Sequence, residues 1–307
     1  MIKVQNAPEL ELYDYDIDKT YSIDIRGSLG INEKMSGFSD TLFKAIFQNE
    51  NKLIYSALLL SYILKDFTLE EILNNLILVK NELDKTVANK KGLRSDYVAL
   101  LNGTKINIEL NNNSSITTLH RNMEYAFRLY SSNVKIDDKT YDYRQTIQIH
   151  LNNFAFKNND KTIDIYTLRN DEGTNLSNKI IIVQIYVPNI RKKWYTSGIG
   201  SLTELERYVL TIMEKNIQVS KKLGKGHKIM EDYIKEAVIA SNDEILLEAY
   251  DKEWALRDEG VRDGIEQKEL EIVCNMLKEN MDTNLISKIT GLSLEEIDSI
   301  KSGNKGI

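Results

Sequence analysis

Residues 94–113 read RSDYVALLNGTKINIELNNN, which is two short apolar runs separated by Asn102-Gly103. An Asn-Gly pair between two such runs is the strongest short-range signal for a β-hairpin, because a type I′ turn requires positive φ at both turn positions. If these two residues form the turn, Leu101 pairs with Thr104, and counting outward fixes every other pair. The stretch therefore predicts an antiparallel hairpin with a defined register.

This register places the two acidic residues of the hairpin, Asp96 and Glu109, directly opposite each other. Alternation along a strand sends successive side chains to opposite faces of a sheet. One face is expected to point into a core and to carry Tyr97, Ala99, Leu101, Ile106, Ile108 and Leu110. The other face is expected to carry Arg94, Asp96, Asn107, Glu109 and Asn111.

Directly opposed like charges destabilise a strand pair, because their Cβ atoms lie only about 5 Å apart. A divalent cation shared by Asp96 and Glu109 would offset this repulsion, since two carboxylates with a backbone carbonyl and waters make a good Mg²⁺ site. The alternative is a solvated face on which two acids fall together by chance. The hairpin alone leaves both interpretations open.

The composition is that of a folded protein, with 42% hydrophobic and 28% charged residues. The net charge of −6 gives no support to a strong nucleic-acid footprint, although a local basic patch can act within an acidic molecule. The single Cys274 excludes an intramolecular disulfide and fits a reducing compartment. The N-terminal segment lacks the apolar core of a signal peptide, and the run 53–64 is too short to span a bilayer. We expect a cytoplasmic protein without membrane association.

Helical and strand-like segments surround the hairpin. Helices are expected from Ser39, over 53–64, from the capping box Thr68-Leu-Glu-Glu71, over 116–130, and from a second capping box Ser201-Leu-Thr-Glu204. Strands are expected at 76–83, 93–101, 105–110, 146–156, 162–168 and 179–187. We predict an N-terminal extension over 1–36, an α/β core over 37–200, a helical region over 201–265 and a helix-turn-helix-like module over 266–307.

This order of elements resembles the PD-(D/E)xK nuclease core, and more narrowly the nuclease-family transposases related to the recombination-promoting nucleases. Four segments carry the resemblance, which runs from about residue 37 to residue 302. They are Asp40-Thr-Leu-Phe43-Lys44, Lys105-Ile-Asn-Ile-Glu109, Arg121-Asn-Met-Glu-Tyr125 and Ile289-Thr-Gly-Leu-Ser-Leu-Glu-Glu-Ile297. The resemblance implies an α/β fold in which a mixed sheet is flanked by helices, followed by an α-helical C-terminal region.

The resemblance also implies roles for individual residues. Asp96 and Glu109 would bind Mg²⁺ or Mn²⁺, with the carbonyl of Leu110 completing the shell. The cation would lower the pKa of a bound water and stabilise charge on the scissile phosphate. The third motif position, which is Lys in the family name and often Gln in this subfamily, falls on Asn111. Asn can hydrogen-bond a water, but it carries no charge.

Two cations could stand in for the missing lysine. Arg94 faces Asn111 across the hairpin, although its guanidinium is always protonated and cannot be a base. Lys44 belongs to the Phe-Lys pair of the first helix and could approach from there. Each of these two cations could instead form a salt bridge with the acidic pair.

Substrate contacts are expected on the helix that follows the acids. Arg121, Tyr125 and Arg128 share one helical face, opposite an apolar stripe that includes Met123 and Phe127. They could bind a phosphate or orient Glu109, or form an ordinary solvated face. By the same resemblance we count Asp40 among the substrate-binding residues.

Two functions are compatible with these patterns. The first is a Mg²⁺-dependent DNA endonuclease that hydrolyses phosphodiester bonds, associated with mobile elements or phage. The second is a nuclease-derived fold that no longer cuts and binds a protein or a nucleic acid, for example as an inhibitor or adaptor in phage–host conflict. The last helices carry Glu295, Glu296 and Asp298, which favours protein contact over DNA reading. A homodimer is compatible with either function.

Overall fold

The computed structural model describes residues 17–25, 27–79, 95–112, 116–136 and 141–302. The chain divides into two compact units, residues 1–250 and residues 251–307. Each unit is described by itself. None of the described helices is both long enough and apolar enough to cross a lipid bilayer.

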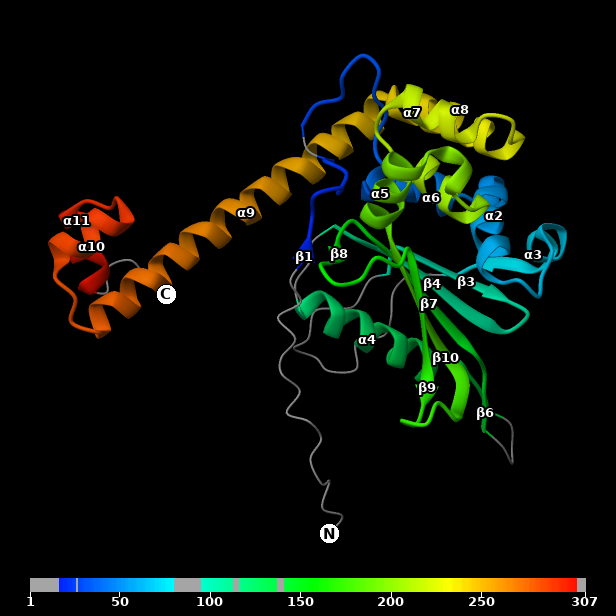
Figure 1. Cartoon of the computed structure of the whole chain (residues 1–307), viewed down its shortest axis with the longest axis horizontal. Helices are drawn as coiled ribbons and strands as arrows, with labels where there is room; N and C mark the ends of the chain where they lie inside the picture. The colour runs from blue at the N-terminus through cyan, green and yellow to red at the C-terminus, as the bar shows by residue number, and fades with distance from the viewer. Residues whose placement is uncertain (1–16, 26, 80–94, 113–115, 137–140, 303–307) are drawn as a thin grey trace, which may run out of the picture. The chain divides into compact units, whose positions relative to one another are not determined.

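A six-stranded mixed sheet forms the centre of the first unit (Figure 1). In spatial order its strands are β2 (Leu76–Leu78), β3 (Tyr97–Leu101), β4 (Thr104–Asn111), β7 (Thr146–Asn152), β10 (Asn175–Tyr186) and β9 (Ile163–Arg169). The three central strands β4, β7 and β10 run parallel, and the outer pairs are antiparallel. This sheet and the helices around it confirm the predicted α/β class.

The remaining elements are helices and two small strand pairs. The helices are α1 (Asp40–Phe47), α2 (Leu53–Ile63), α3 (Leu69–Asn75), α4 (Ile116–Ser131), α5 (Val187–Ser197), α6 (Glu204–Met213), α7 (Ile217–Gly224), α8 (Lys228–Ser241), α9 (Glu244–Lys278), α10 (Thr283–Thr290) and α11 (Leu294–Lys301), with 3-10 turns at Glu50–Lys52 and Ile199–Ser201. The small pairs are β1 (Ile17–Asp18) with β8 (Ala155–Phe156), and β5 (Val134–Ile136) with β6 (Tyr141–Tyr143).

The β3–β4 hairpin has the predicted turn and register. Asn102 and Gly103 have φ of 49° and 84°, so both adopt the positive φ that a type I′ turn requires. Leu101 pairs with Thr104, and the ladder continues to Tyr97 opposite Ile108. The hairpin prediction is therefore confirmed, and the side chains of β4 alternate between two faces of the sheet.

Helix α4 packs on the polar face of the sheet, against β4, β7 and β10. Its orientation differs from the sequence prediction, because Met123 and Phe127 are 49% and 48% exposed while Tyr125 is buried. The sheet face under α4 carries amide and carboxyl side chains, so it offers no apolar surface on which the apolar stripe of the helix could pack. The helix therefore turns a mixed set of side chains inward, namely Asn122, Tyr125, Ala126 and Leu129.

Capping explains where several helices begin. The box of Thr68 with Glu71 is confirmed, and another box, of Ser293 with Glu296, begins α11. The box predicted from Ser201 is wrong by two residues, because the N-cap of α6 is Thr203, which pairs with Glu206. Pro188 follows the end of β10 and lies in the first turn of α5, where a missing backbone N–H costs nothing.

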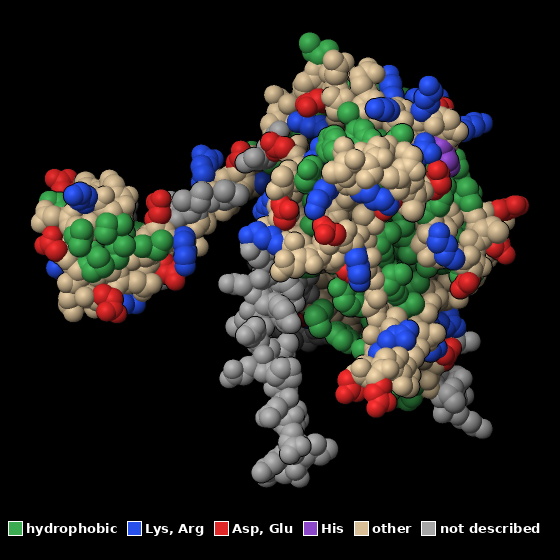
Figure 2. Space-filling model, viewed as in Figure 1, with side chains coloured by type: hydrophobic (Ala, Val, Ile, Leu, Met, Phe, Trp, Pro, Cys, Tyr) green, Lys and Arg blue, Asp and Glu red, His purple; other side chains and the backbone are tan. Residues whose placement is uncertain are grey.

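The second unit consists of the C-terminal part of α9 with α10 and α11. Its core contains Val273, Ile286, Ile297 and Ile300. Apolar side chains also gather on its surface (Figure 2), where Leu285, Ile289 and Leu294 are between 45% and 56% exposed.

Candidate functional site

Asp96 directly precedes β3, one residue beyond the last pair of the hairpin ladder. Its carboxylate Oδ2 accepts a hydrogen bond from the backbone N–H of Leu110 at 2.9 Å. Its backbone carbonyl accepts a hydrogen bond from the side chain of Gln48, the C-cap of α1. These two contacts fasten Asp96 between the end of α1 and the end of β4.

Glu109 lies near the end of β4 and is only 3% exposed. Its Oε1 accepts a hydrogen bond from the side-chain amide of Asn107 at 2.9 Å. The negative charge of Asp96 acts directly on Glu109. The two acids therefore lie close together, but on a buried face of the sheet and not on the solvated face that was the alternative from sequence.

Burial raises the pKa of both carboxyl groups, because an ionised acid loses hydration inside the protein. The pKa of Asp96 rises to about 6, with a further contribution from the charge of Asp40. The pKa of Glu109 rises to about 8, with a further contribution from Asp96. The charge of Asp96 therefore opposes ionisation of Glu109.

Three of the other predicted site residues lie within electrostatic reach of the acids. Lys44 forms an ion pair with Asp40 at 3.0 Å, one turn apart on α1. The charge of Lys44 lowers the pKa of Asp96. The charge of Arg121, on α4, lowers the pKa of both Asp96 and Glu109. The structure thus brings residues from α1, α4 and the hairpin to one place.

The remaining predicted residues are placed differently. Tyr125 is buried on the inner side of α4. Arg128 forms an ion pair with Glu124 at 2.6 Å on the same helix, and it lies about 10 Å along the axis from Arg121. Leu110 offers its N–H to Asp96. Arg94 lies outside the described residues.

A continuous row of buried polar side chains extends from Glu109 across the three parallel strands. We call it the polar row; it consists of Asn107, Glu109, Asn111, Gln148, His150, Asn152 and Gln184. Amide hydrogen bonds of 2.8–2.9 Å join Asn107 to Gln148, Asn111 to Asn152, and Asn152 to Gln184. The row lies on the same face of the sheet as Glu109, under α4.

Asn111 is bound inside this row. Its amide nitrogen donates to Asn152 Oδ1 at 2.9 Å and lies 3.3 Å from His150 Nδ1. Burial lowers the pKa of His150 to about 3, and the nearby charge of Arg121 lowers it further, so this imidazole is neutral near pH 7. Asn111 Oδ1 and His150 Nε2 are buried and have no hydrogen-bond partner within the described residues. Such buried groups without partners are uncommon in native proteins and call for a functional explanation.

The members of the row on β7 and β10 were not predicted as site residues. The signal was present, because β7 alternates Thr146, Gln148, His150 and Asn152 with Ile147, Ile149 and Leu151. This is the same alternation that β4 shows with Asn107, Glu109 and Asn111. Two strands with equal polar alternation imply one shared polar face when they pair in register.

The chemistry of the acid pair fits a magnesium-type cation. Mg²⁺ prefers oxygen ligands, takes one or two carboxylates and keeps several waters. Asp96 and Glu109 supply such oxygens, and a cation between them would favour the ionised forms that burial disfavours in both groups and that the charge of Asp96 further disfavours in Glu109. Throughout the described part of the chain, no three His, Cys, Asp or Glu side chains are grouped so as to hold a metal ion. Two carboxylates are a donor set that a hydrated Mg²⁺ ion accepts.

Comparison with known proteins gives one match. A family model described as PD-(D/E)XK nuclease family transposase matches residues 37–261 of the 307-residue chain. The matched region contains α1, the β3–β4 hairpin and α4, which are the elements that hold the acids. No curated protein and no solved structure matches the chain.

Proposed function

The chain belongs to the PD-(D/E)XK nuclease family transposases, and from that premise we propose that it is a metal-dependent endonuclease that hydrolyses phosphodiester bonds in DNA. The observation that carries this proposal is the buried pair of Asp96 and Glu109. Buried acids with strongly raised pKa values concentrate at functional sites. The family model covers the same segment of chain and adds a reaction class to that chemistry.

We assign Asp96, Glu109 and the carbonyl of Leu110 to a Mg²⁺ or Mn²⁺ ion. When bound, the ion would make a coordinated water more acidic and stabilise negative charge on the phosphate. Asp96 is held for this role by the N–H of Leu110, and Glu109 by the amide of Asn107. Arg121 contributes positive charge beside both acids, where it would attract the anionic backbone of DNA.

Lys44 and Asn111 complete the proposed site. The charge of Lys44 already acts on Asp96, so we assign it the position of the cation that the family name leads one to expect at residue 111. Asn111 would hold the end of β4 through Asn152, and its buried Oδ1 is the group we assign to ordering water. We place the activity in the context of a mobile element, as the description of the family suggests.

A second candidate is a protein of this fold that binds nucleic acid or protein without cutting. One observation favours it: the amide nitrogen of Asn111, which occupies the place of a catalytic lysine, is committed to Asn152 inside the sheet. The exposed Leu285, Ile289 and Leu294 of the second unit offer a surface for a protein partner. Under this candidate the acid pair would not be needed for activity.

Cleavage of plasmid DNA by the purified protein with Mg²⁺ or Mn²⁺ separates the two candidates. We expect metal-dependent nicking that is lost in Asp96→Asn and in Glu109→Gln, which keep the shapes of the side chains. The matched control is Asp232→Asn, because this acid lies on α8 in a surface pair with Lys235. Cleavage that survives both acid substitutions would contradict the nuclease assignment. Failure of the wild type to cut or to bind Mn²⁺ would favour the binding protein.

A further inference from the structure

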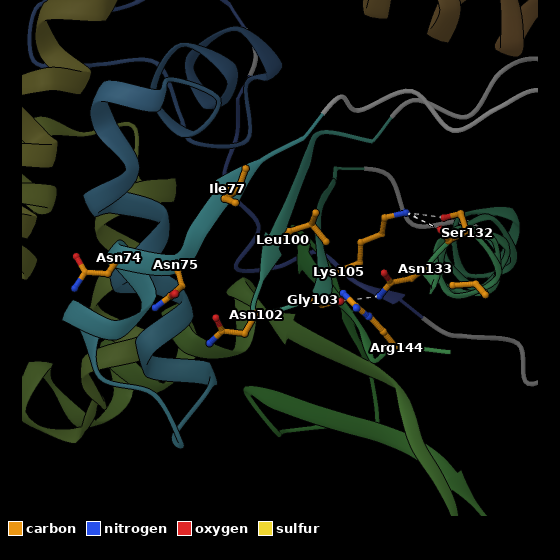
Figure 3. A pocket seen from close by; sticks show the side chains of 11 residues that line it. Asn74, Asn75, Ile77, Leu100, Asn102, Gly103, Lys105, Ser132, Asn133 and Arg144 are labelled. Atoms are coloured by element: carbon orange, nitrogen blue, oxygen red, sulfur yellow. Dashed lines mark hydrogen bonds between the residues drawn. The ribbon is translucent and has the colours of Figure 1, made fainter. Parts of the chain in front are cut away.

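An open pocket of about 590 Å³ lies at the turn end of the β3–β4 hairpin (Figure 3). Its lining comes from the hairpin, the end of α3, β2, the residues from the end of α4 to the start of β5, and Arg144 just before β7. Two of the lining residues, Lys105 and Arg144, are cations, and neither was assigned to the acid site. Among the residues described by the structure, no Asp or Glu lines this pocket.

Lys105 lies near the beginning of β4 and lines the pocket with its charged side chain. Its Nζ donates to the carbonyl of Ser132 at 3.2 Å and to the hydroxyl of Ser132 at 2.9 Å. An ammonium group has three protons, so one remains for a ligand. Burial lowers the pKa of Lys105, which is the response of a cation with no carboxylate beside it.

Arg144 lies across the turn from Lys105. An added Cβ on Gly103 would come within 2.8 Å of Arg144 Nη1, so the guanidinium rests directly over the turn. Its acidic neighbour in the described chain is Asp142, 3.6 Å from Nε, and both side chains are solvent-accessible. A guanidinium has five N–H donors in a planar fork, and this loose pair leaves most of them available.

Figure 3 shows Lys105, Asn133 and Arg144 beside one another near Gly103. Asn133 fixes the floor of the pocket, because its amide donates to the carbonyls of Gly103 and Gln145 at 3.2 and 2.8 Å. Asn102 adds an exposed amide at the rim. A lysine ammonium, an arginine fork and an amide around one open pocket form a set of donors suited to a phosphate group.

The pocket lies on the same face of the sheet as the acid pair. Leu100 pairs with both Ile77 and Lys105, so these lining residues share one face. Glu109 follows Lys105 by four residues, which places it on that face at a distance of about 13 Å along the strand. A strand of duplex DNA carries one phosphate per 3.4 Å of axis, so about four phosphates would span the two places.

We propose that this pocket, centred on Lys105 and Arg144, binds a backbone phosphate of the nucleic acid whose chain passes the acid pair. This inference rests on the proposed function for the identity of the ligand. It adds a contact that positions the substrate and takes no part in bond breaking. In a chain of net charge −6, such a local site would supply part of the attraction that the protein as a whole does not.

The test measures binding of a short fluorescent DNA duplex by the full chain in the Asp96→Asn background, over a range of salt concentrations. Adding Arg144→Gln is expected to weaken binding about tenfold and to reduce the slope of log affinity against log salt by about 0.9. Arg144→Lys should retain most of the salt slope. The matched control is Arg169→Gln, because Arg169 is exposed on β9 and bonds only locally, to Thr167 and Gly173 among the described residues. Lys105→Gln, checked for folding by circular dichroism, should reproduce the effect of Arg144→Gln.

The outcomes distinguish a failure of the pocket proposal from a failure of the nuclease assignment. If the wild type does not cut but Arg144→Gln weakens DNA binding, the pocket stands and the nuclease assignment fails. If the wild type cuts and neither substitution alters affinity or salt slope, the pocket proposal fails alone. Absence of measurable DNA binding overturns it as well. If inorganic phosphate raises the melting temperature of the wild type but not of Arg144→Gln, while DNA affinity is unchanged, the pocket holds a free phosphate compound and the backbone proposal is wrong.

Discussion

The two faces of β4 are equally buried and chemically opposite. Ile106 and Ile108 on one face are 0% exposed, and Asn107 and Glu109 on the other are 0% and 3% exposed. The apolar face gains the full transfer free energy of its side chains. The polar face must recover its desolvation cost through hydrogen bonds within the polar row. Burial alone therefore does not distinguish supporting residues from reactive ones, whereas the chemistry of each face does.

The largest expected effect is a loss of DNA cleavage when the acid on the polar face of β4 is replaced. Glu109→Gln should lower the rate of DNA cleavage by at least about 10³-fold, equivalent to roughly 4 kcal/mol of activation free energy. It removes a metal ligand while it keeps the size of the side chain. Rates measured in single-turnover assays with Mg²⁺ test this, together with the denaturation midpoint, which should not fall. A variant that cuts at more than a tenth of the wild-type rate would remove Glu109 from the site.

Ile108→Ala should have the opposite effect, lowering stability while leaving the rate of DNA cleavage almost unchanged. Removing a fully buried isoleucine from the apolar face should lower the free energy of unfolding by about 2–5 kcal/mol, because it leaves a cavity beside Tyr97 and Ile106. The rate per folded molecule should stay close to that of the wild type. Urea denaturation and the same cleavage assay check both parts. Loss of cleavage without loss of stability would show that the division between the faces is wrong.

A smaller effect should appear in the dependence of stability on pH. The pKa of Glu109 is about 8 in the folded protein against an ordinary value of 4.5, so the folded state keeps a proton that the unfolded chain releases between these values. The stability from this group is complete below pH 4.5 and is lost as pH rises toward 8. In EDTA, the melting temperature of the wild type should fall by a few degrees relative to Glu109→Gln between pH 5 and pH 8.5.

The wild type must be compared with Glu109→Gln because a second buried group, Lys34, changes the stability with pH in the opposite direction. Burial lowers the pKa of Lys34 to about 7, so its contribution to stability rises with pH between that value and 10.5. Lys34 is present in both proteins and cancels in the difference. Parallel curves for the wild type and Glu109→Gln would contradict the raised pKa. Added Mg²⁺ should abolish the difference by favouring the ionised form.

The smallest effect concerns the connections within the polar row. In a double-mutant cycle, Asn111→Ala and Asn152→Ala should show a coupling of about 1 kcal/mol in the free energy of unfolding. The two amides share a hydrogen bond of 2.9 Å between buried side chains. The control cycle pairs Asn111→Ala with Thr196→Ala on α5, whose hydroxyl bonds to its own helix. Equal coupling in both cycles would mean that Asn111 and Asn152 do not stabilise the fold as a bonded pair.

Local chemistry allowed part of this fold to be predicted. The turn at Asn102 and Gly103 fixed a register because positive φ at both positions selects one hairpin geometry. The capping box at Thr68 was predicted from equally local information. The start of α6 was misplaced because Ser201 and Thr203 each have a glutamate three residues on, and only the structure shows that Thr203 is the cap.

Features that depend on distant partners were not predictable in this way. The inner face of α4 depends on the polar character of β7 and β10, which lie beyond it in the chain, so periodicity placed Met123 and Phe127 inside when both are exposed. The pairing of the acids was predicted from their register, but their burial required knowing that α4 packs on that face of the sheet. The pocket at Lys105 escaped prediction because Arg144 reaches it only through the fold.

The alternation of β4 has a consequence for mutations that change the length of the chain. Deleting one residue between Thr104 and Ile108 would move every later side chain of β4 to the opposite face. Glu109 would then enter the apolar layer, and Leu110 would take its place opposite His150. A single deletion there disturbs both faces at once, whereas a substitution changes one side chain. Random insertion–deletion libraries should therefore recover folded proteins with changes in exposed loops such as residues 170–174 between β9 and β10, and almost none within β4.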